Sequence, residues 1–186
     1  MLQEVLKYNR EFVENGGYKP HITSALPDKK VAILTCMDTR LVELLPAAIG
    51  FKNGDVKILK NAGAVISHPY GSVVRSLIVA IYKQGVESVW IVGHSDCGMK
   101  GIDVDGIIES MIKHGIERSV IDDIANSGVD FQKWLGGFCS TREAVFNAMD
   151  LLASHPLIPK DISIEGLIID STTGELSHIR SIEARK

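Results

Sequence analysis

The stretch Glu87–Met99, ESVWIVGHSDCGM, decides the fold, because it joins a short apolar run to residues that can bind a metal. Its first part, Glu87–His94, is typical of a strand buried on both faces of a parallel sheet. The run ends at Gly93 and His94, and Cys97 follows three residues after the histidine. A strand that stops in this way indicates a site at the carboxyl edge of a sheet. Such a site needs at least one further residue from elsewhere in the chain.

The composition is that of one globular domain. The chain has 186 residues, of which 45% are apolar and 23% charged, so it can build a sizeable core and is not expected to be disordered. We therefore expect a single domain over residues 1–186. The net charge of −3 comes without a basic stripe, so a nucleic-acid partner is not expected.

The cysteines and the apolar runs indicate the compartment. Three cysteines, Cys36, Cys97 and Cys139, are too few and too scattered for the disulfide framework of a secreted domain. The first residues carry charges throughout and lack the apolar centre of a signal peptide, and no apolar run is long enough to span a bilayer. These features predict a cytoplasmic protein with reduced thiols and no membrane partner.

Apolar runs and amphipathic segments alternate along the chain, which is typical of βαβ units and of a parallel sheet covered on both faces. We predict strands at residues 29–36, 55–63, 87–94, 162–170 and 174–182, and helices at 41–49, 71–84, 107–113, 118–126 and 141–153. The expected fold class is therefore α/β, with a mostly parallel sheet of about five strands flanked by helices.

The N-terminal segment 2–14 predicts a further, amphipathic helix. Its apolar residues are Leu2, Val5, Leu6, Phe12 and Val13, and Gly16 and Gly17 follow its end. Little sequence surrounds this helix that could cover its apolar stripe. We therefore expect it to pack on a neighbouring subunit of a two-fold dimer.

Cys36 is the residue that completes the site at His94 and Cys97. It ends the first predicted strand, so it meets the other two residues if the first and third strands are neighbours. Two thiolates and one imidazole are donors that zinc favours, and three protein ligands leave a fourth position for water, as in catalytic zinc sites. Gly93 and Gly98 are expected to give the backbone room for the turn.

The spacing alone leaves other interpretations open. Buried cysteines and hydrogen-bonded histidines are common in protein cores. The thiols also permit a redox-active pair, although Cys36 and Cys97 lack the C-x-x-C spacing of thiol oxidoreductases. A structural zinc site would normally have four ligands, and the spare thiol, Cys139, lies far along the chain.

Asp38 and Arg40 follow Cys36 at a spacing of two residues. In an extended segment such residues point to the same side, so the guanidinium can bind the carboxylate through two hydrogen bonds. One interpretation is a surface ion pair that contributes about 0–1 kcal/mol. The other is that Arg40 keeps Asp38 ionised and aimed at the metal, where the carboxylate accepts a proton or fills the open position.

The sequence resembles the β-class carbonic anhydrases along nearly its whole length. The segments that carry the resemblance are CMDTRL (36–41), GDVKILKNAGAVI (54–66), VVRSLIVAIY (73–82), VGHSDCGM (92–99), SHPLIP (154–159) and GLIIDSTTGEL (166–176). The small size and the surroundings of Met37 and Met99 are most similar to the compact archaeal and bacterial branch of that family.

The resemblance implies one Zn²⁺ per chain, bound by Cys36, His94 and Cys97, with Asp38 and Arg40 as a catalytic dyad. It implies the reversible hydration of carbon dioxide to bicarbonate and a proton by zinc-bound hydroxide. In some members the equivalent of Asp38 is a fourth zinc ligand in a closed, inactive form. The family fold is a mostly parallel sheet with flanking helices, and its dimers bury the N-terminal helix and often pair into tetramers.

Three further residues are candidates for contacts to the substrate: Gly98, through its main-chain amide, Lys60 and Gly63. The larger plant-type enzymes have a glutamine where this chain has Lys52, and an arginine where it has Lys60. Both differences fit the compact branch, and they leave open whether Lys60 faces the pocket or the solvent.

Two other functions stay open at this point. One keeps the scaffold and hydrolyses carbonyl sulfide or carbon disulfide, as some family members do, and the other is a non-catalytic zinc-binding or redox-sensing module. The intact pair of Asp38 and Arg40 argues against the second, because a structural site needs no carboxylate aimed at an open position. His68, Tyr70 and His114 are candidates for moving the proton to solvent.

Overall fold

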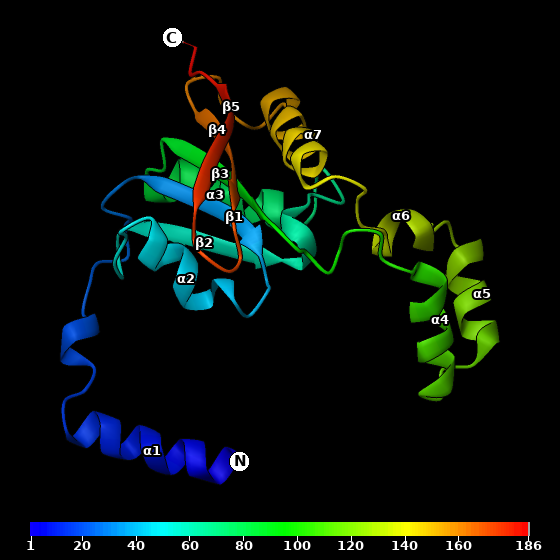
Figure 1. Ribbon diagram of the computed structural model, residues 1–186, viewed down its shortest axis with the longest axis horizontal. Coiled ribbons are helices and arrows are strands. Elements are labelled where there is room, and N and C mark those ends of the chain that lie inside the picture. Colours follow the sequence, from blue (N-terminus) through cyan, green and yellow to red (C-terminus); the bar gives the residue numbers. More distant parts are fainter. Residues whose placement is uncertain (186) are drawn as a thin grey trace.

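The computed structural model describes residues 1–185, which form a five-stranded sheet in the order β2-β1-β3-β4-β5 (Figure 1). The strands are β1 (Val31–Cys36), β2 (Val56–Asn61), β3 (Ser88–His94), β4 (Ser163–Ile169) and β5 (Leu176–Ile182). Neighbouring strands from β2 to β4 are parallel, and β5 is antiparallel to β4. The predicted mostly parallel α/β sheet is confirmed.

The helices are α1 (Leu2–Glu14), α2 (Leu41–Ala48), α3 (Ser72–Gln84), α4 (Val104–Lys113), α5 (Arg118–Asn126), α6 (Phe131–Leu135) and α7 (Thr141–Ser154), with short 3₁₀ turns η1 (Lys19–His21) and η2 (Ala62–Ala64). Within residues 1–185, none of them combines the length and the apolar character that crossing a membrane requires.

Two helices differ from the sequence prediction. Helix α4 begins three residues before the predicted Ile107, because the Asp103 side chain accepts a hydrogen bond from the amide of Gly106 and so caps the helix. Helix α6 was not predicted, since five residues are too few to show a helical period. Its cap is Asp130, which accepts from the amide of Lys133. In both cases a cap, rather than apolar periodicity, marks the start.

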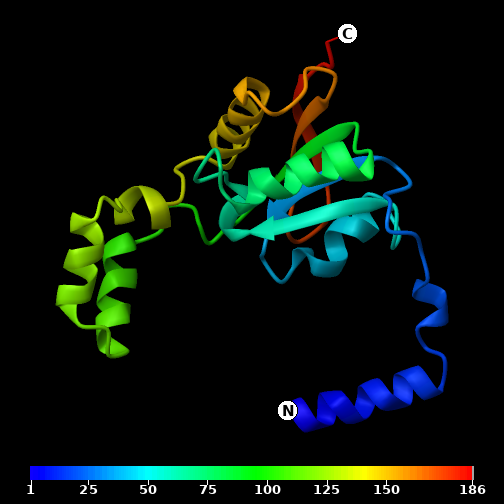
Figure 2. The same cartoon turned by 180° about the vertical axis from the view of Figure 1, so that it is seen from behind.

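Strand β1 is buried over its whole length, as its apolar run predicts. Ala32 and Leu34 face a core shared with α3 and α7, while Val31 and Ile33 face a second core shared with α2. Figures 1 and 2 show these two layers from opposite sides of the sheet. Because β1 lies between β2 and β3, its carboxyl end lies between the ends of these two strands at one edge of the sheet.

Gly93 sits where α7 crosses β3. A methyl group there would lie 2.7 Å from Thr141 Cγ2 and 3.0 Å from Val145 Cγ2. We expect Gly93→Ala to lower the free energy of unfolding by about 1–3 kcal/mol, because the helix must move away from the strand. Urea denaturation measures the change. Gly98→Ala is the matched control, since a methyl group at Gly98 meets no atom within 4 Å. Equal losses in both variants would contradict this account of the packing.

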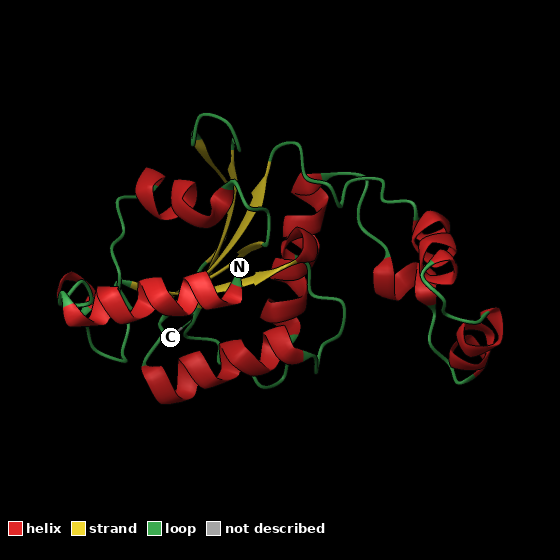
Figure 3. Cartoon of the chain, turned by 90° about the horizontal axis from the view of Figure 1, so that it is seen from below, coloured by secondary structure: helices red, strands yellow, loops and turns green. Residues whose placement is uncertain are grey.

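Two parts of the chain extend away from the sheet. Helices α4, α5 and α6 form a lobe on one side of the sheet (Figures 1 and 3), and α1 lies apart from the rest of the chain (Figures 1 and 2). None of the residues of α1 is buried. Its apolar residues Leu2, Val5 and Val13 are 68%, 57% and 53% exposed. The single chain therefore leaves uncovered the stripe that the sequence predicts to pack on another subunit.

This exposed stripe leads to a prediction about assembly. We expect the full chain to sediment as a dimer and a chain that lacks residues 1–16 to sediment as a monomer. The deletion removes the apolar face of α1 that is expected to pack on the other subunit. Sedimentation velocity measures both. The matched control is Lys7→Ala, which changes an exposed charged residue of the same helix. A full-length chain that stays monomeric at micromolar concentration would sink the prediction.

Candidate metal centre and catalytic site

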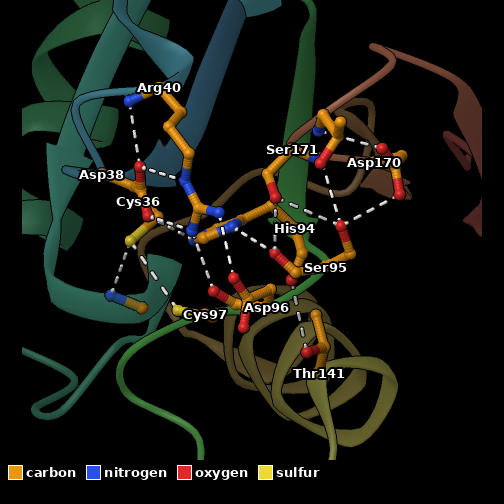
Figure 4. A network of polar contacts seen from close by, with 12 residues as sticks. Cys36, Asp38, Arg40, His94, Ser95, Asp96, Cys97, Thr141, Asp170 and Ser171 are labelled. Atoms are coloured by element: carbon orange, nitrogen blue, oxygen red, sulfur yellow. Dashed lines mark hydrogen bonds and ion pairs between the residues drawn. The ribbon is translucent and has the colours of Figure 1, made fainter.

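The predicted metal ligands lie at one edge of the sheet. Cys36 and His94 are the last residues of β1 and β3, and these strands pair in parallel with Thr35 beside Val92. Their ends therefore lie side by side, and Cys97 follows in the turn after β3. The ligand atoms of the three residues lie within 4.8 Å of one another, and all three residues are buried (Figure 4).

The two cysteines are close but not bonded. The Sγ atoms of Cys36 and Cys97 are 3.9 Å apart, far beyond the length of about 2.05 Å of a disulfide bond, and both thiols are free. Burial raises the pKa of the Cys97 thiol, and the adjacent Cys36 raises it further. Two buried thiolates at this distance would repel each other, and a divalent cation between them would stabilise both charges.

His94 supplies the third donor. Its Nδ1 lies 2.8 Å from the main-chain oxygen of Ser95, so Nδ1 is the nitrogen that donates a hydrogen bond. Its Nε2 is buried and has no hydrogen-bond partner within residues 1–185. An unpaired imidazole nitrogen beside two thiols fits Zn²⁺, and a set of three protein ligands leaves one position open, as in catalytic zinc sites.

A network after β4 holds the orientation of His94. The main-chain oxygen of Ser95 also accepts from the Ser171 hydroxyl at 3.0 Å, and the Ser95 hydroxyl donates to Asp170 at 3.2 Å. Asp170 in turn accepts from the main chain of the two residues after Ser171, which lowers the pKa of its carboxyl. These bonds keep the Ser95 carbonyl in place, so the His94 ring keeps Nε2 available for a metal.

Main-chain amides stabilise both sulfur atoms. The N–H of Gly63 donates to Cys36 Sγ at 3.3 Å, and the N–H of Met99 lowers the pKa of Cys97. Gly63 has a φ of 81°, and a Cβ there would lie 3.0 Å from Phe138 and 3.1 Å from Met99. The structure thus places Gly63, predicted as a substrate contact, against the candidate ligand Cys36.

The expected role of the two glycines in the turn is wrong. The residue in the left-handed region between His94 and Cys97 is Asp96, with a φ of 53°, while Gly93 and Gly98 do not have positive φ. Aspartate tolerates this conformation better than most residues. Gly93 is instead required by the close approach of α7.

Asp38 and Arg40 form the predicted bidentate ion pair. Arg40 Nε donates to Asp38 Oδ1 at 3.0 Å and Nη2 donates to Oδ2 at 2.8 Å, while the Arg40 amide also donates to Oδ1 at 2.9 Å. Asp38 Oδ2 is 3.9 Å from His94 Nε2, which is too long for a hydrogen bond. The carboxylate therefore faces the metal centre while Arg40 holds it, and it is not in the position of a fourth ligand.

The comparisons with known proteins agree with this geometry. The family model for carbonic anhydrase matches residues 31–176. This chain belongs to the β-carbonic anhydrase family. The carbonic anhydrase homologue YvdA of Bacillus subtilis is 47% identical over 175 residues, which are 94% of this chain and 89% of that protein. The crystal structure of a β-carbonic anhydrase from Trichomonas vaginalis has a TM-score of 0.87 at 34% identity, and covers 100% of this chain and 99% of that one. A more distant relative, the carbon disulfide hydrolase of Acidithiobacillus thiooxidans, is 27% identical over 80% of this chain and 76% of its own length.

In this β-carbonic anhydrase chain the site opens into a cavity of about 620 Å³. The cavity is lined by the ligand cysteines, the dyad, Asp96 and Gly98, together with apolar atoms of Met37, Ala62 and Met99. Gly98 therefore borders the cavity, as its predicted role requires. Lys60 is exposed at the end of β2 and does not line it. Partial burial of the Lys60 amine nevertheless lowers its pKa, and the charges of Cys36 and Asp38 oppose this shift.

Of the three candidates for moving the proton, His68 and Tyr70 are neighbours, with ring centroids 6.2 Å apart, whereas His114 lies elsewhere. His68 lines a second cavity of about 400 Å³, and Ala62 and Met99 line both this cavity and the first. Tyr70 is 66% exposed. His114 follows α4 in the lobe and lies at the end of that helix away from the sheet (Figure 1). Within one chain, His68 is the best placed of the three.

The pair of Asp38 and Arg40 gives a prediction for the acid range. Hydrogen bonds from Arg40 hold the pKa of Asp38 well below its usual range. A depressed pKa adds stability above the ordinary value of about 4, and this stability is lost as the pH falls through the lower folded value. We expect Arg40→Ala to raise the pKa of Asp38 toward that value, as seen in the ¹³C shift of its carboxyl carbon between pH 7 and 2. An unchanged titration curve would contradict this.

Proposed function

We propose that this protein catalyses the reversible hydration of carbon dioxide to bicarbonate and a proton, with one Zn²⁺ per chain bound by Cys36, His94 and Cys97. The observation that carries the proposal is the carboxylate of Asp38. It lies 3.9 Å from the unpaired Nε2 of His94, and Arg40 holds both of its oxygens. A purely structural zinc site has no use for an ionised carboxylate at this position.

Each residue has a distinct task in this proposal. Zn²⁺ would supply a water molecule acidic enough to act as a nucleophile near neutral pH. Asp38 would accept a hydrogen bond from a water molecule in the cavity and so orient it toward the carbon of CO₂. Arg40 keeps Asp38 ionised and fixed, since its own charge and its hydrogen bonds favour the carboxylate. In the closed form that the family resemblance implies, Asp38 would leave Arg40 and become the fourth ligand.

The substrate has a suitable space beside these residues. The cavity joins apolar atoms of Met37, Ala62 and Met99 to the polar dyad, which suits an apolar molecule that becomes an anion. The Gly98 amide is the proposed donor to an oxygen of bicarbonate, because it borders the cavity. Lys60, at the rim, is proposed to attract the anion rather than to touch it.

The alternative substrates are carbonyl sulfide and carbon disulfide. A relative named as a carbon disulfide hydrolase is 27% identical to this chain, whereas the relative named as a carbonic anhydrase homologue is 47% identical. This difference supports carbon dioxide.

The experiment compares the three substrates on one preparation. Zinc is counted by mass spectrometry, CO₂ hydration is followed by stopped flow with a pH indicator, and sulfide release is measured from the other two compounds. We expect about one zinc per chain and a turnover for CO₂ above that for either sulfur compound. Faster sulfide release would show that carbonyl sulfide or carbon disulfide is the preferred substrate. No turnover of any of the three substrates would favour a non-catalytic zinc-binding module.

The assembly and the compartment follow the same proposal. We propose a homodimer, in which the exposed stripe of α1 packs on the partner, and dimers that can pair into tetramers. Two tetrameric β-carbonic anhydrases of the fungus Sordaria macrospora share the fold of this chain. The two buried, unbonded thiols fit a reducing compartment, so we propose that the protein acts in the cytoplasm.

A further inference from the structure

Arg40 has a second carboxylate partner that the dyad does not include. Its Nη1 donates to Asp96 Oδ2 at 3.0 Å, and its Nη2 donates to the Asp96 main-chain oxygen at 2.9 Å. Figure 4 shows the guanidinium lying between Asp38 and Asp96. Together with the bonds to Asp38, four of the five N–H donors of the guanidinium are in use.

The two partners come from different loops. Asp38 and Arg40 both belong to the segment between β1 and α2, so the bonds between them do not connect this segment to the turn after β3. Asp96 belongs to the turn after β3 and lies between the ligands His94 and Cys97. The bonds from Arg40 to Asp96 therefore tie the dyad to the loop that carries two of the three ligands.

The backbone of Asp96 is arranged for this contact. Its φ of 53° lies in the left-handed region, which non-glycine residues rarely adopt, although aspartate does so more readily than most. The Asp96 side chain is 86% exposed, so it does not contribute to the packing of the core. Water screens the attraction between such an exposed charge and Arg40, so its value lies in geometry rather than in stability.

We infer that Asp96 is a positioning residue: it fixes Arg40, and through Arg40 the carboxylate of Asp38, relative to the metal ligands. The inference rests on the proposed function, because it assigns a task within the same site. It also gives the dyad a second anchor. When Asp38 leaves Arg40, as the closed form requires, the two bonds to Asp96 keep the guanidinium in place.

Three substitutions separate this role from a need for the turn conformation alone. Asp96→Gly removes the carboxylate and adopts the same φ without strain. Asp96→Asn keeps an acceptor and tolerates the left-handed region, and Asp96→Ala loses the carboxylate and strains the turn. If Asp96 positions Arg40, Asp96→Gly lowers kcat by roughly threefold to thirtyfold with little change in KM, and Asp96→Asn recovers part of it. If only the turn conformation matters, the glycine and asparagine variants match the wild type and only alanine is impaired, which would overturn the inference.

A double-mutant cycle tests whether the effect passes through Arg40. In the Arg40→Ala background, Asp96→Gly is expected to change kcat by less than about twofold, since the residue that Asp96 positions is already missing. An equal loss in both backgrounds would show that Asp96 acts in another way. Zinc content is measured in every variant, so a loss of metal is not mistaken for a loss of positioning.

A readout without turnover keeps the inference separate from the proposed function. The Nε–H group of Arg40 gives an NMR signal whose exchange with water reports how firmly the guanidinium is held. In the zinc-loaded protein we expect Asp96→Gly to speed this exchange several-fold, even if no substrate is turned over. Unchanged exchange together with an inactive wild type would remove both proposals. Faster exchange with an inactive wild type would remove only the proposed function.

Discussion

Replacing Asp38 by alanine is expected to lower kcat for CO₂ hydration by about 10²–10⁴ while zinc stays bound, because a positioned proton partner contributes on this order to a rate. The carboxylate accepts three hydrogen bonds from Arg40 and lies 3.9 Å from the unpaired nitrogen of His94, so it faces the reacting position without being a ligand. Stopped-flow rates at several pH values, with zinc measured in each sample, give the comparison.

The control for this experiment is a second aspartate that is paired with an arginine. Asp122 pairs with Arg118 on the surface of α5, where both side chains are more than half exposed. Asp122→Ala is expected to leave kcat within about twofold, since such pairs contribute little. Equal rates for Asp38→Ala and the wild type across the pH range would show that Asp38 and Arg40 form only a surface ion pair. They would favour the alternative function, a non-catalytic zinc-binding module.

Cys97→Ser is expected to remove zinc and, with it, essentially all CO₂ hydration. A serine hydroxyl is a much poorer zinc ligand than a thiolate, and Cys36 and His94 are then too few protein ligands for a stable site. Metal analysis after dialysis against a weak chelator measures the loss. The matched control is Cys139→Ser, because Cys139 is exposed and is not one of the three grouped residues that could hold a metal. Full zinc occupancy in Cys97→Ser would refute the assignment of the ligands.

The strands and the grouping of the three candidate ligands could be predicted from the sequence because local patterns encode them. The apolar runs that end at Cys36 and His94 show two buried strands, and the rule that ligands collect at the carboxyl ends of parallel strands brings the two ends together. The pairing of β1 with β3 was a condition of that argument, and the structure confirms it. The grip of Arg40 on Asp38 follows from a spacing of two residues and was predicted in the same way.

The rest of the site depends on contacts between distant segments. Ser95 meets Asp170 and Ser171 only because β4 lies beside β3, and no local pattern near Ser95 shows this. The segment Asp170–Gly174 did carry a signal, since aspartate followed by serine and threonine is typical of a turn in which the carboxylate binds main-chain amides. It indicated a turn, but not that the turn would support a metal ligand.

Asp96 was missed for a related reason. From the sequence, we attribute the turn to the room that the glycines on its flanks, Gly93 and Gly98, give the backbone. The backbone bends at the aspartate instead, and this directs its carboxylate toward Arg40 from 56 residues earlier in the chain. Only the fold shows that a residue between two ligands also contacts the dyad.

The measurement that tests the central claim most directly is the exchange of ¹⁸O between labelled carbon dioxide and water at chemical equilibrium. It follows hydration itself, without a pH change or a coupled reaction. We predict that the wild-type protein speeds the loss of label in proportion to its zinc content, and that Asp38→Ala with the same zinc content speeds it at least about a hundredfold less. Loss of label at the uncatalysed rate, in a wild-type protein that carries one zinc per chain, would contradict the account.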